Sequence, residues 1–195
     1  MEAELIDTTQ LVEIRWHGRG GQGAVTSAEL LARAAINEGK YAQAFPKFGP
    51  ERRGAPVQAF NRINASEPVR VRADVDKPDV VVGLDPTLLR IVDVTSGLKD
   101  DGILIVNTSR TIEEVEAQFG TKWVLAVLDA GKIAREELGV PIVNTTMLGA
   151  LLRATAIVDT ESIVEPLQKR FGRLADRNFN AVKRAFNETV IKERG

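Results

Sequence analysis

Three short apolar segments constrain the fold of this chain more than any other feature of its sequence. They cover residues 79–84, 102–106 and 123–128, and each is followed by a segment in which apolar residues recur at helical spacing. A near-continuous apolar run of this length is typical of a parallel strand that is buried on both faces. Strands that alternate with helices predict an α/β fold, here a Rossmann-like, doubly wound and mostly parallel sheet.

The rest of the chain extends this pattern in both directions. Further strands are predicted at residues 11–17, 40–45, 55–63 and 69–72. A turn at residues 64–67 would join the last two of them into a β-hairpin insertion. Helices are predicted at residues 24–38, 111–119, 129–138, 145–157, 161–171 and 175–193, so that the chain ends in C-terminal helices. Pro166 is expected to kink or break the helix that contains it.

The length of 195 residues fits one domain. Residues 1–10 are polar and acidic, and we expect them to form a peripheral N-terminal segment. Residues 11–195 are expected to form a single domain, because no internal repeat or low-complexity segment interrupts them.

Composition excludes several classes of function. The chain has 26 Lys and Arg against 27 Asp and Glu, a net charge of −1, which gives no general attraction to nucleic acid or to an anionic membrane. It has no cysteine and a single histidine, His17, so it offers no thiolate for an iron–sulfur cluster and no three-histidine zinc site. No apolar run approaches the about 18 residues that a membrane span needs, and no secretory signal is visible. We therefore expect a cytoplasmic location.

A glycine cluster lies between the first predicted strand and the first predicted helix. It consists of Gly18, Arg19, Gly20, Gly21, Gln22 and Gly23, which matches the G-x-G-x-x-G pattern of phosphate-binding turns. A dinucleotide site would also need an acidic residue at the end of the second strand, and residues 41–46 supply none. Two interpretations remain: the glycines permit a tight turn and close packing, or they place a helix N-terminus against a phosphate or another anion.

A basic segment follows the second predicted strand. Its cationic residues are Lys47, Arg52, Arg53, Arg62, Arg70 and Arg72, against Glu51 and Glu67. Aromatic and arginine side chains together are typical of interface centres, so we favour a subunit contact over a merely solvated face, with an anion contact as a further alternative. The candidate residues for this contact are Phe45, Lys47, Phe48, Glu51, Arg52 and Arg53.

Two other features have simpler interpretations. His17, beside the glycine cluster, is expected to be a hydrogen-bonded structural residue, because no nucleophile or carboxylate adjoins it in sequence. We assign no catalytic residue and no metal ligand to this chain. Asn144 is placed to cap the helix that follows it. The small residues Gly149, Ala150 and Ala154 in that helix predict close packing against a second helix.

Several motifs together give the chain a family resemblance. They are, in order, residues 14–23 (IRWHGRGGQG), 44–46 (AFP), 49–56 (GPERRGAP), 59–63 (AFNRI), 78–82 (PDVVV), 106–108 (VNT) and 144–150 (NTTMLGA). From about Val12 to its C-terminus the chain resembles the gamma subunits of pyruvate:ferredoxin oxidoreductases. Residues 54–56 and 59–60 are more similar to the pyruvate and branched-chain members than to the 2-oxoglutarate members.

The resemblance implies a subunit of a complex that converts a 2-oxoacid and coenzyme A to an acyl-CoA, carbon dioxide and reduced ferredoxin. It implies alpha, beta and delta subunits as partners, with thiamine diphosphate, magnesium, iron–sulfur clusters and coenzyme A held on those other subunits and no cofactor bound by this chain alone. It also makes the glycine cluster, Gly18 to Gly23, the candidate for a contact with coenzyme A. The isolated chain is then expected to self-associate through its partner-facing surface. The alternatives are a stand-alone Rossmann-like nucleotide-binding protein, or a scaffold without a ligand.

Overall fold

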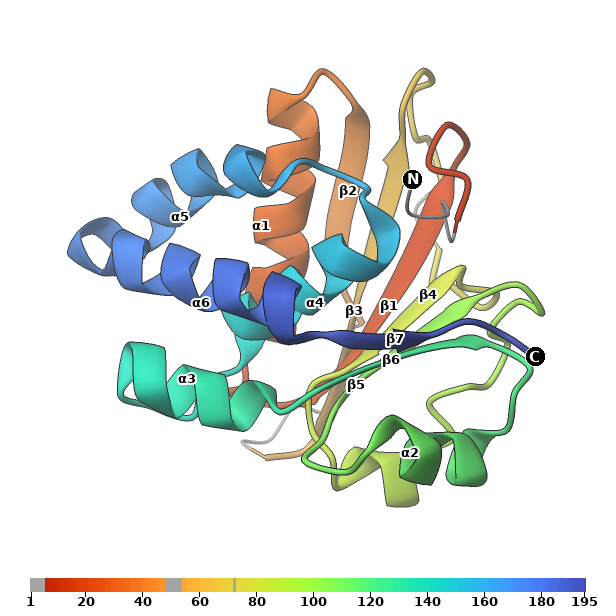
Figure 1. The fold of residues 1–195 in the computed structure, drawn as a ribbon. Coiled ribbons are helices and arrows are strands. Elements are labelled where there is room, and N and C mark those ends of the chain that lie inside the picture. The colour runs from red at the N-terminus through yellow and green to blue at the C-terminus, as the bar shows by residue number, and fades with distance from the viewer. Residues whose placement is uncertain (1–5, 48–53, 72) are drawn as a thin grey trace.

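The computed structural model describes residues 6–47, 54–71 and 73–195 of the chain. Within these residues a seven-stranded sheet forms the centre of the molecule, in the order β2-β3-β1-β4-β5-β6-β7 (Figure 1). The strands are β1 (Val12–Arg19), β2 (Tyr41–Pro46), β3 (Pro56–Asn64), β4 (Val80–Gly83), β5 (Ile103–Asn107), β6 (Val124–Leu128) and β7 (Val190–Lys192). The helices are α1 (Ala24–Asn37), α2 (Ile112–Phe119), α3 (Ala130–Leu138), α4 (Asn144–Thr155), α5 (Val164–Phe171) and α6 (Ala175–Glu188), with short 3₁₀ turns η1 (Leu88–Arg90), η2 (Thr160–Ile163) and η3 (Gly172–Leu174).

Most strands of the sheet point the same way. Strands β1, β4, β5 and β6 pair in parallel, β3 is antiparallel to both β1 and β2, and β7 is antiparallel to β6. Strand β2 therefore runs with β1, and only β3 and β7 run against the rest within the described residues. The predicted mostly parallel α/β sheet is confirmed.

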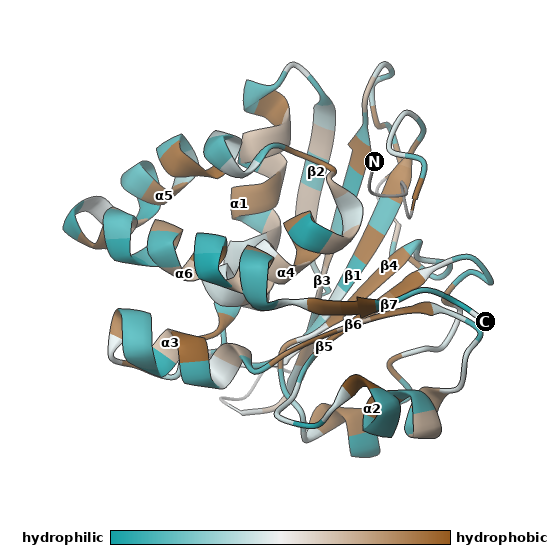
Figure 2. Ribbon diagram, viewed as in Figure 1, coloured by the Kyte–Doolittle hydropathy of each residue, from teal (hydrophilic) through white to brown (hydrophobic). Residues whose placement is uncertain are grey.

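Side chains alternate between the two faces of each strand, and each face has its own hydrophobic core. On one face Trp16 and Ile105 pack with α1, α3, α4, α5 and α6. On the other face Val81 and Leu104 pack with α2 and η1. The two groups of helices are seen on opposite sides of the sheet in Figure 1, and in Figure 2 the central strands are largely brown, whereas the helices carry both teal and brown residues. The sheet is doubly wound, as predicted.

The hairpin of the sheet is formed by different strands from those predicted. Strand β3 pairs with β2 on one side and β1 on the other, and residues 69–71 form no strand. Instead, the Arg62 guanidinium donates hydrogen bonds to the backbone carbonyls of Val71, Ala73 and Asp74. The prediction failed because the carbonyls of Val69 and Val71 accept from the side chains of Gln43 and Arg62 rather than from a neighbouring strand.

The last predicted helix is also shorter than expected. Helix α6 ends at Glu188, Thr189 is extended, and Val190 begins β7 instead of continuing the helix. Three β-branched residues in succession, Thr189, Val190 and Ile191, favour a strand. Pairing with the otherwise open edge of β6 then stabilises that strand. Spacing alone did not reveal this change of structure.

Local signals explain where the other helices begin. Thr111 and Glu114 form a reciprocal capping box at the start of α2, and Asp129 caps α3 through the Lys132 amide. Pro166 lies in the first turn of α5, where its missing N–H has no intrahelical partner to lose, so the predicted long helix divides into η2 and α5. Among the described residues, the helices are too short or too polar to cross a membrane.

Candidate functional site

The glycine cluster forms the turn from β1 into α1, at the carboxyl end of the parallel strands. Gly21 and Gly23 have positive φ angles of 96° and 84°. A Cβ atom on Gly23 would lie 2.7 Å from the Asn144 Nδ2 atom at the start of α4, whereas a Cβ on Gly21 would have no atom within 4 Å. Gly23 is thus required by backbone conformation and by close packing, which supports the tight-turn interpretation of the cluster.

The Asp85 carboxylate, which follows the neighbouring strand β4, organises this turn. The Gln22 side chain accepts a hydrogen bond from the Arg19 amide (2.7 Å) and donates one to Asp85 Oδ2 (2.6 Å). The Arg19 guanidinium donates to Asp85 Oδ2 (3.1 Å) and to Thr87 Oγ1 (2.7 Å). Thr87 in turn donates to Asp85 through its amide and its hydroxyl. We call Arg19, Gln22, Asp85 and Thr87 the Asp85 network.

The Asp85 carboxyl is held in its charged form. Burial opposes its ionisation, but the hydrogen bonds from Thr87 and Gln22 and the charge of Arg19 outweigh burial and lower its pKa. The Asp85 carboxylate thus already places a negative charge beside the glycine turn. A phosphate that bound here would gain the guanidinium of Arg19 and meet the charge of Asp85.

The Asp85 network also ties down the segment that precedes β3. Arg19 Nη1 donates to the carbonyl of Gly54 (3.0 Å), and the Gly20 amide donates to the carbonyl of Ala55 (2.9 Å). The sequence analysis did not identify this role of Asp85. The available signal was an acidic residue immediately after a buried parallel strand, because the carboxyl ends of such strands meet at one edge of the sheet.

Two asparagines complete this edge of the sheet. Asn107, at the end of β5, donates to the carbonyl of Leu84 (2.8 Å) and accepts from the amide of Ala130 (3.0 Å). Asn144 is the first residue of α4 rather than the residue before it, and its carbonyl accepts a hydrogen bond from Ser27 of α1. The Asn107 side chain and the Asn144 backbone carbonyl thus link neighbouring elements, and both residues are buried, so they fix the position of the turn.

His17 lies inside the protein near the end of β1. It is 3% exposed, and its Nε2 atom accepts a hydrogen bond from Arg15 Nε (3.0 Å). Burial and the neighbouring charge of Arg15 lower the pKa of His17 to about 4, so the imidazole is neutral at pH 7. Arg15 also donates to the carbonyls of Val75, Val94 and Ser96. His17 is thus a hydrogen-bonded interior residue, as the sequence indicated.

The basic segment is divided by the structure. Phe48, Glu51, Arg52, Arg53 and Arg72 lie outside the described residues. Lys47 is exposed and pairs with Asp74 (2.9 Å).

Arg62, predicted to belong to the basic surface, is 3% exposed and pairs with Glu13 (2.7 Å). Its guanidinium also lies 5.3 Å from the ring centre of Phe45, which contacts Phe60. The prediction for Arg62 was wrong because its face of β3 is covered by Val71, Ala73 and Asp74, whose carbonyls accept hydrogen bonds from its guanidinium.

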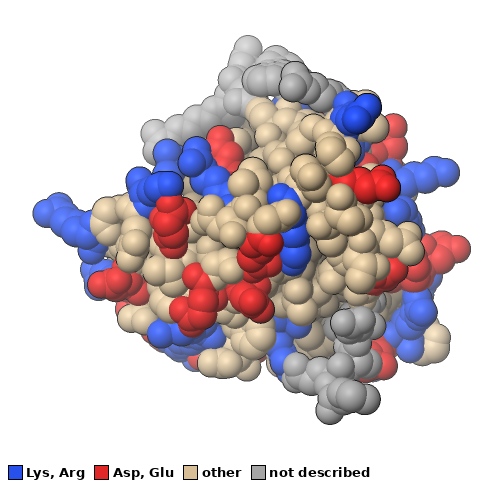
Figure 3. Space-filling view, turned by 90° about the horizontal axis from the view of Figure 1, so that it is seen from above, with Lys and Arg blue, Asp and Glu red and all other residues tan. Residues whose placement is uncertain are grey.

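The surface charge of the described residues is mixed. Figure 3 shows Lys and Arg interspersed with Asp and Glu over one face of the molecule. No group of three or more His, Asp or Glu side chains in the described part of the chain is arranged to hold a metal ion.

The comparisons with known proteins agree over nearly the whole chain. Residues 13–188 match the family model of pyruvate ferredoxin/flavodoxin oxidoreductase. The chain is 55% identical over 185 residues to the pyruvate/ketoisovalerate oxidoreductases common subunit gamma of Thermococcus kodakarensis, covering 94% of this chain and 100% of that protein. It is 51% identical to the pyruvate synthase subunit PorC of Methanothermobacter marburgensis, covering 91% of this chain and 97% of that protein.

A solved structure shares the fold as well. The crystal structure of the pyruvate oxidoreductase subunit PORC of Thermotoga maritima superimposes with a TM-score of 0.84 at 44% identity, covering 94% of this chain and 99% of that one.

The sheet, its two layers of helices and the glycine turn define an α/β protein of the doubly wound class. Together with the match over residues 13–188, the comparisons establish that the chain belongs to the pyruvate ferredoxin/flavodoxin oxidoreductase family.

Proposed function

We propose that this chain is the gamma subunit of a multi-subunit 2-oxoacid:ferredoxin oxidoreductase of the pyruvate type. The observation that carries the proposal is the 55% identity to a gamma subunit across that protein's full length. In this proposal residues 11–195 are one gamma-type domain and residues 1–10 are peripheral to it. The complex works in the cytoplasm.

The complex converts a 2-oxoacid and coenzyme A to an acyl-CoA, carbon dioxide and reduced ferredoxin. We propose alpha, beta and delta subunits as the partners of this chain, and ferredoxin as the acceptor that the complex serves. Thiamine diphosphate, magnesium, iron–sulfur clusters and coenzyme A belong to the other subunits. The absence of cysteine from this chain supports that division, because clusters are held mainly by thiolates.

The role of this chain is structural, with assistance to the use of coenzyme A. Coenzyme A carries phosphates, and the glycine cluster contains Arg19 and leads into the N-terminus of α1, both of which suit an anion. Because Asp85 now holds Arg19, a bound phosphate would have to compete for that guanidinium. We therefore propose that coenzyme A is touched by Arg19 at the rim of the turn rather than enclosed by the glycines.

Pyruvate is the preferred 2-oxoacid in this proposal. The Thermococcus kodakarensis relative is named as a subunit common to pyruvate and ketoisovalerate oxidoreductases. A subunit that two enzymes share is not expected to determine which oxoacid each of them uses. This supports a role for this chain in assembly and in the use of coenzyme A.

A pull-down of the tagged chain from its native host tests the proposed function. We expect a thiamine-dependent subunit and a ferredoxin-like subunit to be recovered and identified by mass. Recovery of the chain alone with a bound nucleotide would overturn the proposal in favour of a stand-alone nucleotide-binding protein.

The coenzyme A role is tested in the purified complex with Arg19→Ala. The KM for coenzyme A should rise while the KM for pyruvate stays unchanged. Arg110→Ala, which alters a cation on the loop before α2, is the control. Equal KM values for coenzyme A in parent and Arg19→Ala complexes would remove Arg19 from the proposal.

A further inference from the structure

Strand β2 is an open edge of the sheet. Among the described residues it pairs only with β3. The Lys47 amide donates to the carbonyl of Gln58 (3.0 Å), so residues 47 and 58 form a hydrogen-bonded antiparallel pair. Such pairs alternate along a ladder, so the odd-numbered residues of β2 bond to β3. The backbone N–H and C=O groups of Ala42 and Ala44 therefore point away from the sheet.

The two edges of the sheet differ in their protection. Natural edge strands are usually short, charged or covered, because unpaired backbone groups recruit other strands. Strand β7 is three residues long and carries Lys192, which pairs with Glu116. Strand β2 is six residues long and has no charged side chain. Pro46 removes one N–H at its end, but Tyr41 to Phe45 carry no charge and no proline that would keep this edge from pairing.

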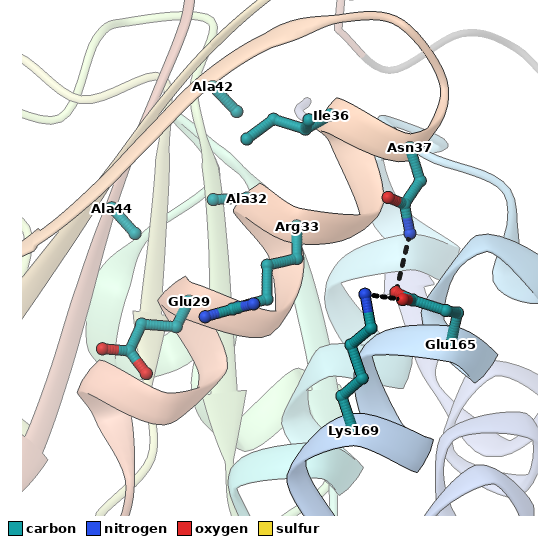
Figure 4. Close-up of a pocket in the computed structure, with 9 residues that line it drawn as sticks. All are labelled: Glu29, Ala32, Arg33, Ile36, Asn37, Ala42, Ala44, Glu165 and Lys169. Carbon is teal, nitrogen blue, oxygen red and sulfur yellow. Dashed lines mark hydrogen bonds and ion pairs between the residues drawn. The ribbon is translucent and has the colours of Figure 1, made fainter.

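A groove runs beside this edge, between α1, β2 and α5 (Figure 4). Its volume is about 440 Å³. The apolar part of its lining consists of Ala32, Ile36, Ala42 and Ala44. Ile36 is 54% exposed, although it is a large apolar side chain. A strand added to β2 would direct alternate side chains into this groove, and the alanines leave room for them.

Together, the groove and the cavity that adjoins it are lined by three cations, Arg33, Lys169 and Arg170, against two carboxylates, Glu29 and Glu165. Lys169 pairs with Glu165, which also accepts a hydrogen bond from Asn37 (3.0 Å). Arg33 lines both this groove and an adjoining cavity of about 190 Å³, and Arg170 lines the latter. Neither arginine makes an ion pair within 4 Å in the described part of the chain. An acidic residue on the incoming segment would complement them.

We propose that the edge of β2 and this groove bind an extended segment of another subunit of the oxidoreductase, which adds a strand to the sheet. The segment places small or medium apolar side chains in the groove and a carboxylate against Arg33 and Arg170. Backbone hydrogen bonds to Ala42 and Ala44 supply the affinity, and the groove supplies the selectivity. This inference rests on the proposed function and names the surface through which assembly occurs.

The test uses the whole complex, purified through a tag on this chain. Ala44→Pro removes one outward amide without breaking the ladder to β3, and Ala44→Lys introduces a long charged side chain into the groove. Val190→Lys makes the matched change on the other edge, at a residue that is 52% exposed. Arg33→Glu tests the rim, with Arg90→Glu on the α2 face as its control. A photoreactive amino acid at Ile36 identifies the neighbour by mass spectrometry of the cross-linked peptide.

We expect Ala44→Pro, Ala44→Lys and Arg33→Glu to recover at least tenfold less of one partner subunit, with melting temperatures near that of the parent. Val190→Lys and Arg90→Glu should recover it fully. The cross-link should join Ile36 to an acidic segment of that subunit. Full recovery with both Ala44 variants, or a cross-link to a second copy of this chain, would overturn the inference alone. A parent chain that recovers no oxidoreductase subunit would overturn the proposed function with it.

Discussion

At the residue scale, Gly21 and Gly23 share a positive φ but differ in what surrounds them. Gly21→Ala should lower the free energy of unfolding by about 1 kcal/mol, because only backbone strain is added. Gly23→Ala should lower it by about 3 kcal/mol, because its Cβ also clashes with Asn144. Urea denaturation of both variants measures the difference. A double-mutant cycle with Asn144→Ala should show coupling for Gly23 and none for Gly21.

His17 gives stability a specific dependence on pH. Its pKa falls from 6.5 to about 4 on folding, so below pH 6.5 the unfolded chain binds a proton that the folded chain does not. The part of the unfolding free energy that depends on neutral His17 is fully present above pH 6.5. It is lost as the pH falls towards 4, and the loss amounts to about 3 kcal/mol. In His17→Gln, whose amide oxygen still accepts from Arg15, unfolding stability should vary less between pH 6.5 and 4. Parallel stability profiles for parent and variant would contradict this account.

The candidate site was only partly predictable from single residues. The glycine cluster is contiguous in sequence and was found. Its partner Asp85 lies 66 residues from Arg19, and Asn144 lies far beyond it, so no local pattern links them to the turn. Arg62 was misplaced because β3 is covered on both faces here: Asn61, Arg62 and Ile63 are all buried, and the segment that covers Arg62 follows β3 without any pattern that marks it as a cover.

At the element scale, the predicted close packing of the helix at residues 145–157 is confirmed by α4 and α6. A Cβ on Gly149 of α4 would lie 2.2 Å from the carbonyl oxygen of Val182 and 2.8 Å from the Cβ of Ala185. Gly149→Ala should therefore separate the two helices and lower the free energy of unfolding by about 2 kcal/mol.

A second helical glycine provides the control. A Cβ on Gly131 of α3 would meet atoms only at 3.4 Å or more. Gly131→Ala should raise the stability slightly, by about 0.5 kcal/mol, because alanine favours a helix. Thermal denaturation distinguishes the two changes by the sign of the shift in Tm. A stabilising Gly149→Ala would mean that the interface between α4 and α6 can accommodate an additional methyl group.

Elements were predictable where one pattern persisted over their whole length. The central strands and α1 were found because burial on both faces and helical spacing are local signals. The choice of strand partners depends on residues that are far apart in sequence. Strand β3 pairs with β1 and β2, whereas residues 69–71, which follow it closely in sequence, were the predicted partner. The end of α6 was missed because Val190 fits both the helical spacing of Phe179, Val182 and Phe186 and the strand that pairs with β6.

At the scale of the whole molecule, assembly and the use of coenzyme A make different demands on the surface. The segment that contains Arg52 and Arg53 leads into Gly54, which Arg19 holds beside the glycine turn. The groove is lined instead by residues of α1, β2 and α5, and a charge reversal at Arg52 and Arg53 changes none of them. The two surfaces can therefore be separated by experiment.

Arg52→Glu combined with Arg53→Glu should weaken the complex or its use of coenzyme A, because it reverses the local charge from two cations to two anions. Native mass of the purified complex and the KM for coenzyme A, measured on the same preparation, separate the two effects. A complex of lower native mass identifies a subunit contact, whatever its KM for coenzyme A. An intact complex with a raised KM for coenzyme A identifies an anion contact. Unchanged mass and unchanged KM would show that these arginines are solvated and take part in neither role.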